Sequence, residues 1–130
     1  MTPATKVLLL NAPNNPTGWT LTRAEQQAIL AHCRRTGTWI VADEVYERLY
    51  YAGAAGAAGE AAPSFLDIAT PEDRLVVAQS FSKSFLMTGW RLGWLVLPPA
   101  LVPAIERLAQ NLYICPSTIA QRAALACFTP

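Results

Sequence analysis

The chain has 130 residues, 52% of them hydrophobic and 15% charged, so it is long and apolar enough to bury the core of a globular domain. The net charge is +1 and there is no basic cluster, so we do not expect nucleic acid or an anionic membrane as a partner. The uncharged apolar stretch 92–105 is too short and too proline-rich to span a bilayer. We therefore expect a small-molecule partner. Three cysteines in no metal-binding spacing and a single histidine, His32, predict neither disulfides nor a metal site and favour a reduced, cytoplasmic setting.

The first predicted unit is a strand, a loop and a helix. The largely apolar run 6–10 predicts a buried strand, and it ends in the turn-forming sequence 11–18. Thr22 followed three residues later by Glu25 is a capping box, which marks the start of a helix, and Gly37 marks its end.

The second predicted unit begins with another buried strand, over 38–42. This strand runs directly into the polar residues Asp43 and Tyr46. The Ala- and Gly-rich stretch 52–62 predicts a flexible surface insertion, and it does not have the pattern of a phosphate-binding loop.

Two further strands are predicted over 75–78 and 93–97, followed by a helix from about Pro99 and a last helix over about 117–126. Strands that alternate with helices indicate an α/β fold, with a mostly parallel sheet and flanking helices. The connection between the third and fourth strands is too short for a helical crossover, so we expect the fourth strand to run antiparallel to the third.

Polar side chains gather where the first three strands end. Ligands of open α/β sheets bind outside the carboxyl ends of the strands, so this edge is the expected binding site. An amine can form a Schiff base with an aldehyde, an anion keeps a ring nitrogen protonated, and hydroxyls with a guanidinium bind a phosphate. The candidate residues for these tasks are Asn15, Asp43, Tyr46, Ser80, Ser82, Lys83 and Arg91.

Four short motifs carry a resemblance to a known family. The motifs N-N-P-T-G, A-D-E-V-Y, S-F-S-K and M-T-G-W-R-L-G stand here in the order of the fold-type I, class I/II aminotransferases, most similar to the aspartate-aminotransferase-like group. The spacings agree as well, with 28 residues from Asn15 to Asp43 and 8 from Lys83 to Arg91. The resemblance extends from about residue 6 to residue 128, and it implies part of the large domain of an enzyme that uses pyridoxal 5′-phosphate.

The resemblance implies catalytic roles for three residues. Lys83 would hold the cofactor covalently and move the proton during the reaction, where an unrelated lysine would be a solvated surface residue. Asp43 would pair with the pyridine nitrogen, and Tyr46 would donate a hydrogen bond to the cofactor's phenolic oxygen together with Asn15. Glu44, one residue on, is expected to point elsewhere and to serve structure.

The resemblance further implies that Ser80, Ser82 and Arg91 bind the cofactor's phosphate. Arg91 offers two parallel donors that a lysine could not supply. Ser82 directly precedes the lysine, and its side chain could point away from the phosphate.

The family's enzymes are much longer than this chain, which resembles the middle of their large domain. The N-terminal part with the aromatic residue stacked on the cofactor ring, and the C-terminal small domain with the arginine for the substrate carboxylate, cannot be mapped onto it. We therefore expect the parent protein to transfer an amino group between an amino acid and a 2-oxo acid, as a homodimer, and the isolated chain to be inactive. Which amino acid is used remains open.

Two alternatives stay open on the sequence alone. One is another fold-type I enzyme with the same cofactor, such as a carbon–sulfur β-lyase. The other is a non-catalytic fragment or interaction module, which is disfavoured because every cofactor-facing position within this segment holds the expected type of residue.

Overall fold

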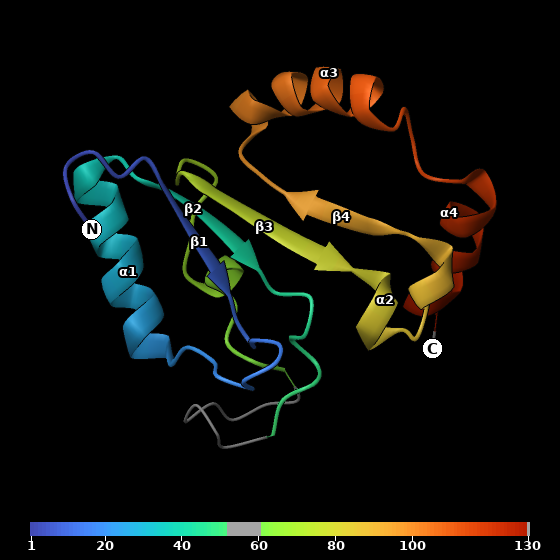
Figure 1. Ribbon diagram of the computed structural model, residues 1–130, viewed down its shortest axis with the longest axis horizontal. Helices are drawn as coiled ribbons and strands as arrows, with labels where there is room; N and C mark the ends of the chain where they lie inside the picture. The colour runs from blue at the N-terminus through green and yellow to red at the C-terminus, as the bar shows by residue number, and fades with distance from the viewer. Residues whose placement is uncertain (52–60, 130) are drawn as a thin grey trace.

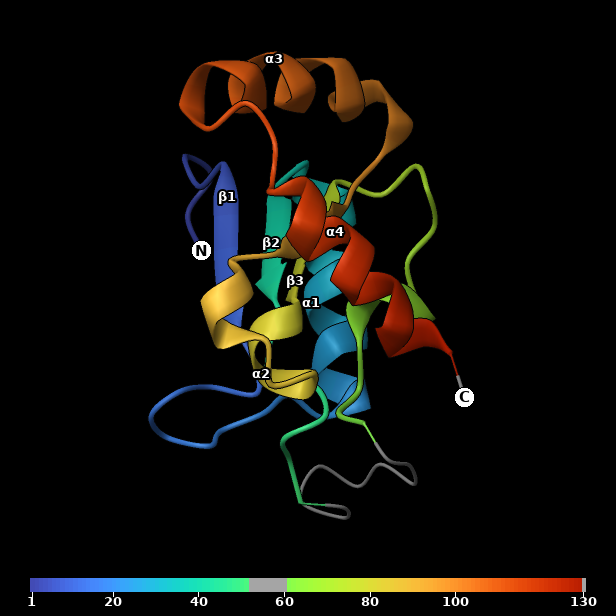
Figure 2. The same cartoon turned by 90° about the vertical axis from the view of Figure 1, so that its right-hand side faces the viewer.

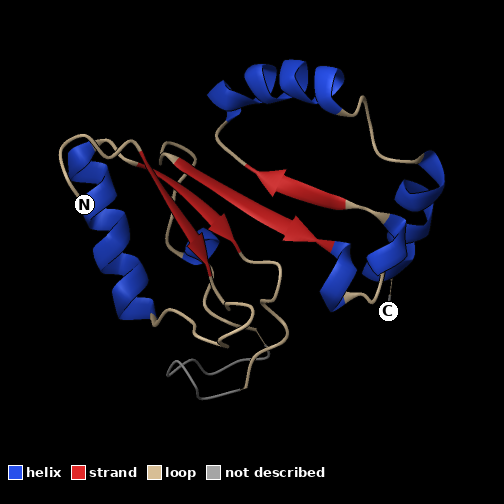
Figure 3. Cartoon of the chain, in the orientation of Figure 1, coloured by secondary structure: helices blue, strands red, loops and turns tan. Residues whose placement is uncertain are grey.

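The computed structural model describes residues 1–51 and 61–129, and its centre is a four-stranded mixed sheet. The strands are β1 (Val7–Asn11), β2 (Trp39–Asp43), β3 (Leu75–Ser80) and β4 (Gly93–Val96), and they lie side by side in chain order (Figure 1). The first three strands run parallel, while β4 runs antiparallel to β3, as Figure 3 shows. The predicted α/β class and the reversed fourth strand are both confirmed, and the strand limits differ from the predicted ones by one or two residues.

The reversal at β4 follows from the short segment before it. This segment holds a single-turn helix, α2 (Phe81–Ser84), and a short 3-10 turn, η2 (Thr88–Trp90). Gly93 at the start of β4 allows the close approach of the strands, because a Cβ at this position would lie 2.6 Å from the backbone oxygen of Gln79. The chain therefore turns back beside β3 without a full helix.

Helix α1 (Arg23–Thr36) begins and ends at the predicted signals. Its first turn has both hydrogen bonds of the capping box between Thr22 and Glu25. Its end is marked by Gly37, whose φ of 68° lies in the left-handed region. One face of α1 packs on the sheet and forms the main core with residues from β2, β3 and the 3-10 turn η1 (Phe65–Asp67). The buried residues of this core are Leu21, Leu30, Cys33, Ile40, Ala42, Phe65, Leu75 and Val77.

The C-terminal part of the chain forms a second, smaller core. The 3-10 turn η3 (Pro99–Leu101) leads into α3 (Val102–Leu112), and α4 (Thr118–Ala124) continues into η4 (Leu125–Phe128). Helix α4 packs against the segment between β3 and β4 through Phe81, Met87, Leu92, Ala120 and Ala124. In Figures 1 and 2, α3 lies at the end of the sheet opposite to α2, so β4 connects the two ends.

Most of the Ala- and Gly-rich stretch that was predicted as an insertion, residues 52–60, lies outside the described residues. The last residue of the stretch, Ala62, is buried, and its N–H donates to the backbone oxygen of Glu47 at 2.7 Å. Within the described ranges, no helix has the length and apolar character needed to cross a membrane.

Candidate active site

The carboxyl ends of the three parallel strands form one edge of the sheet. Asn11 at the end of β1 lies beside Asp43 at the end of β2, and Asp43 lies beside Ala78, two residues before β3 ends at Ser80. Each strand then continues into a segment that carries candidate residues. The sheet thus brings parts of the chain that are far apart in sequence to a common edge.

The loop after β1 is held by two asparagine side chains. The Oδ1 of Asn11 accepts from the side-chain amide of Asn14 at 2.9 Å and from the N–H of Asn15 at 3.2 Å. The Oδ1 of Asn14 in turn accepts from the hydroxyl of Thr17 at 2.7 Å. These local bonds fix the backbone on both sides of Asn15 and leave its own side chain to interact with another strand.

Asn15, Tyr46 and Lys83 come together at this edge. The Nδ2 of Asn15 donates to the phenolic oxygen of Tyr46 at 2.9 Å, across 31 positions of sequence. The Nζ of Lys83 lies 5.9 Å from the centre of the Tyr46 ring, which is within the range of a cation–π interaction. A phenol therefore lies between an amide and a primary amine, with the three groups supplied by three different strand ends.

Asp43 and Glu44 are neighbours in sequence but lie in different surroundings. Asp43 is half-buried at the end of β2, and its Oδ1 accepts from the N–H of Val45 at 3.3 Å. Glu44 is only 3% exposed, and its carboxylate accepts from the hydroxyl of Ser64 and the N–H of Phe65. The prediction that Glu44 points elsewhere and serves structure is confirmed.

Of the three predicted phosphate ligands, Ser80 and Ser82 lie at the start of α2, and Arg91 directly follows η2. Ser80 caps α2, with its Oγ accepting from the N–H of Ser82 at 3.0 Å and donating to the backbone oxygen of Leu92 at 3.3 Å. Ser82 itself is buried, whereas Arg91 is exposed and donates to the backbone oxygen of Thr88 at 3.1 Å. Among the described residues no hydrogen bond joins Arg91 to either serine.

A hollow of about 640 Å³ lies beside Arg91, between the β3–β4 pair and the linker from α3 to α4. The linker contributes Tyr113, Cys115 and Ser117 to its lining. The lining thus combines the charged Arg91 with aromatic and apolar side chains such as Trp94 and Leu95.

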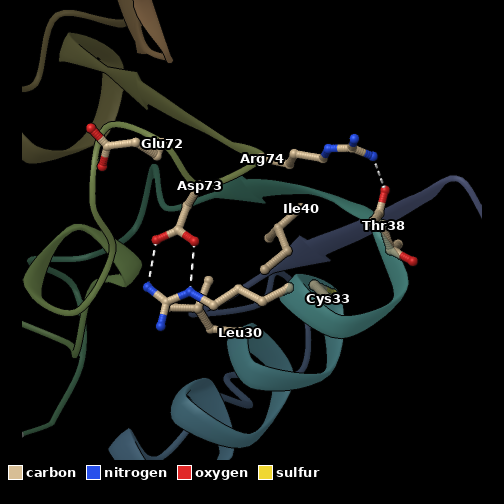
Figure 4. A pocket seen from close by; sticks show the side chains of 9 residues that line it. Leu30, Cys33, Thr38, Ile40, Glu72, Asp73 and Arg74 are labelled. Atoms are coloured by element: carbon tan, nitrogen blue, oxygen red, sulfur yellow. Dashed lines mark hydrogen bonds and ion pairs between the residues drawn. The ribbon is translucent and has the colours of Figure 1, made fainter.

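A second hollow, of about 200 Å³, lies at the opposite edge of the sheet, where β2 and β3 begin (Figure 4). In it the guanidinium of Arg34 binds the carboxylate of Asp73 through two hydrogen bonds, at 2.7 and 2.6 Å. The hydrogen bonds from Arg34 lower the pKa of Asp73, and burial raises the pKa of the Cys33 thiol. The Arg34–Asp73 pair joins α1 to the residues directly before β3, so we interpret this hollow as a structural junction.

A mixed sheet that presents a lysine, a phenol and a carboxylate at the carboxyl ends of its parallel strands fits the fold-type I transferases, and solved structures agree with this class. The crystal structure of an aspartate aminotransferase from Thermotoga maritima matches 98% of this chain with a TM-score of 0.85 at 34% identity. That of an aromatic aminotransferase from Pyrococcus horikoshii matches the whole chain with a TM-score of 0.87 at 30% identity.

The family model for aminotransferase class I and II matches residues 2–129, and the chain belongs to this family. It is 38% identical over 128 residues to the valine–pyruvate aminotransferase of Mycobacterium tuberculosis, covering 98% of this chain and 31% of the relative. It is 37% identical over 130 residues to the aspartate aminotransferase of Geobacillus stearothermophilus, covering 99% and 32%. The chain thus spans about a third of the length of the relatives that it matches.

Membership of this family implies a pyridoxal-phosphate cofactor, and the described residues fit such a group. The amine of Lys83 and the phenol of Tyr46 lie together, and the carboxylate of Asp43 is at the adjoining strand end. Arg91 uses one of its five guanidinium N–H groups for Thr88, which leaves capacity for an anion.

Sequence reasoning missed the residues that hold the site in place. Asn11 and Asn14 lie within the turn-forming stretch 11–18. The stretch is rich in asparagine, and this composition could have indicated side-chain hydrogen bonds within the loop. The partners of Glu44 lie 20 and 21 positions further along the chain, and no local pattern indicates them.

Proposed function

We propose that this chain forms part of the cofactor-binding domain of a longer, pyridoxal-phosphate-dependent aminotransferase, which transfers an amino group between an amino acid and a 2-oxo acid. The observation that carries the proposal is the contact of Asn15, Tyr46 and Lys83 at the carboxyl edge of the sheet. Family membership over residues 2–129 supports it.

In the proposed site, Lys83 binds the cofactor covalently through its Nζ. Asp43 pairs with the pyridine nitrogen and keeps it protonated, while Tyr46 and Asn15 donate hydrogen bonds to the phenolic oxygen. The hydroxyls of Ser80 and Ser82 and the guanidinium of Arg91 bind the phosphate. Arg91 contributes the strongest of these phosphate interactions, because a guanidinium can bind two phosphate oxygens at once.

Pyridoxal phosphate, when bound, supplies an electron sink for the electron pair that remains after the substrate's α C–H bond is broken. Lys83 would supply the acid/base group, because its Nζ, when it is free and neutral, could take a proton from the substrate α-carbon and give it back. The position of Nζ over the ring of Tyr46 keeps this amine at the edge of the site.

The identity of the amino acid is left open in the proposal. The similar proteins include transaminases named for aspartate, for valine with pyruvate and for arginine with pyruvate. The same segment thus occurs in enzymes with acidic, apolar and basic substrates, so selection among side chains falls to parts of the protein beyond this segment. We further propose a homodimer in the cytoplasm, a location that suits the three free thiols.

The covalent role of Lys83 is tested by reduction. The full-length protein is loaded with pyridoxal phosphate, treated with borohydride and digested, and the labelled peptide is mapped. The chain has two lysines, Lys6 and Lys83, so Lys6→Ala is a matched control. We expect the wild-type protein to carry the label on Lys83 and the Lys6→Ala variant to be labelled to the same extent. The Lys83→Ala variant should carry no label in this segment. Label on another lysine of the wild-type protein would refute the covalent role of Lys83.

The reaction type is tested by spectroscopy of the same loaded protein. Addition of an amino acid should abolish the cofactor's visible absorbance, and a 2-oxo acid should restore it. A carbon–sulfur β-lyase would instead release ammonia from a sulfur amino acid and would need no 2-oxo acid. The 130-residue chain alone should show no turnover, since apolar residues such as Leu9 (69% exposed) and Leu112 (69% exposed) are uncovered in it.

A further inference from the structure

The side chain of Glu44 connects the turn after β2 to a distant segment of the chain. Its Oε2 accepts from the hydroxyl of Ser64 at 2.5 Å, and its Oε1 accepts from the N–H of Phe65 at 2.9 Å. Burial raises the pKa of Glu44, so this placement has an energetic cost that the two hydrogen bonds offset only in part. A costly buried carboxylate suggests a role beyond filling space.

The segment that binds Glu44 is itself fixed to helix α1. The Nε2 of Gln26, which is 2% exposed, donates to the backbone oxygen of Pro63 at 2.7 Å. The Nη1 of Arg23 donates to the backbone oxygen of Ser64 at 2.8 Å, and Arg23 also forms an ion pair with Asp67. The two partners of Glu44 are thus held on the rigid helix side of the sheet.

The turn that Glu44 begins also carries Tyr46. The N–H of Glu47 donates to the backbone oxygen of Glu44 at 3.0 Å, which closes a turn around Tyr46. At its far end the turn is held by Glu47, whose carboxylate accepts from the Nε2 of Gln79 at 2.9 Å. The backbone that presents the phenol is therefore tied on one side to β3 and on the other, through Glu44, to α1.

We propose that Glu44 is a positioning residue for Tyr46. By accepting hydrogen bonds from the hydroxyl of Ser64 and the N–H of Phe65, Glu44 fixes the turn after β2. That turn keeps the Tyr46 phenol within reach of Asn15 and Lys83. This inference rests on the proposed function and adds to it a residue that touches neither cofactor nor substrate.

The test uses the full-length protein loaded with pyridoxal phosphate, and its main readout is the pH midpoint of the cofactor's visible absorbance band. A hydrogen bond from Tyr46 withdraws charge from the cofactor's phenolic oxygen, so Tyr46→Phe should raise the midpoint. Glu44→Ala should raise it as well, by up to about one pH unit, the size expected for one hydrogen bond to one protonation state. The double variant should show no further rise, because both changes remove the same interaction.

Glu44→Gln is the conservative variant, since its amide oxygen can accept from Phe65 and its amide nitrogen can donate to the Ser64 hydroxyl. It should keep the wild-type midpoint, as should Glu106→Ala, a control at an exposed residue of α3. Where Glu44→Ala fails to fold, Ser64→Ala removes one of the two bonds and should give a smaller rise in the same direction.

A wild-type midpoint in a folded Glu44→Ala or Ser64→Ala variant, or additive shifts in the double variant, would overturn the positioning role. A merely structural glutamate would lower thermal stability and leave the midpoint unchanged. A wild-type protein that shows no cofactor band would overturn the proposed function itself, which separates the two failures.

Discussion

Replacement of Gly93 by alanine should destabilise the protein at the point where β4 leaves the lysine-bearing segment. The added Cβ would lie 2.6 Å from the backbone oxygen of Gln79, about 0.4 Å inside the 3.0 Å below which such contacts are essentially not seen. Backbone atoms cannot rotate away as a side chain can, so β3 and β4 must separate. We expect a loss of about 1–3 kcal/mol, the usual cost of overpacking.

The matched control for this prediction is Gly89→Ala. A Cβ at Gly89 meets nothing within 4 Å, and its backbone is not in the left-handed region. This variant should be neutral or slightly stabilising, by up to about 1 kcal/mol, because alanine restricts the unfolded chain.

The assay is thermal or urea unfolding of the full-length apoprotein for both variants. Gly93 pairs with Ser80, directly before α2, so separation of the strands should also weaken the binding of pyridoxal phosphate by Gly93→Ala. Equal unfolding midpoints for the two alanine variants would refute the steric reasoning.

Three further predictions concern stability. Thr22→Ala removes the side-chain half of the capping box and should cost about 1 kcal/mol in urea unfolding, whereas a neutral result would mean that Glu25 alone holds the start of α1. Arg34 lowers the pKa of Asp73, so the stabilisation from this pair is present above the ordinary aspartate pKa and is lost as pH falls through the lowered one; Asp73→Asn should flatten the acid side of a plot of Tm against pH. Burial raises the pKa of Glu44, so the folded state holds the carboxyl proton to higher pH than the unfolded state does. The free energy of unfolding should therefore fall as pH rises from the ordinary glutamate pKa through the raised one. Glu44→Gln should remove that fall, and an unchanged curve of Tm against pH would contradict the raised pKa of Glu44.

Much of the fold could be predicted from the sequence because its signals are local. The capping box at Thr22 and the glycine at 37 lie within a few residues of the backbone groups they satisfy, and both helix ends are where they indicate. The reversed β4 follows from the length of one connection. The strand limits shifted by a residue or two because hydrogen bonding to neighbours decides where a strand ends.

The contact of Asn15, Tyr46 and Lys83 was predictable for a different reason: parallel strands place their carboxyl ends at one edge, so polar residues there must meet. The contacts that hold these three residues in place could not be predicted from the sequence. The bond from Glu44 to Phe65 joins positions on either side of the stretch 52–60, and only packing against α1 brings them together. The left-handed backbone of Arg91, with φ of 53°, likewise has no signal in a residue that normally avoids this region.

The antiparallel direction of β4 has a consequence for how the site can vary. Strand β4 carries the chain away from the end of the sheet where Lys83 lies, and α3, which is about 16 Å long, carries it back. The linker at 113–117 therefore lines the hollow beside Arg91. The linker takes no part in the hydrogen bonds of the sheet, so insertions or exchanges there would reshape the mouth of the hollow while the strands keep their register. Evolution can therefore vary this rim of the hollow separately from the strands that form the scaffold.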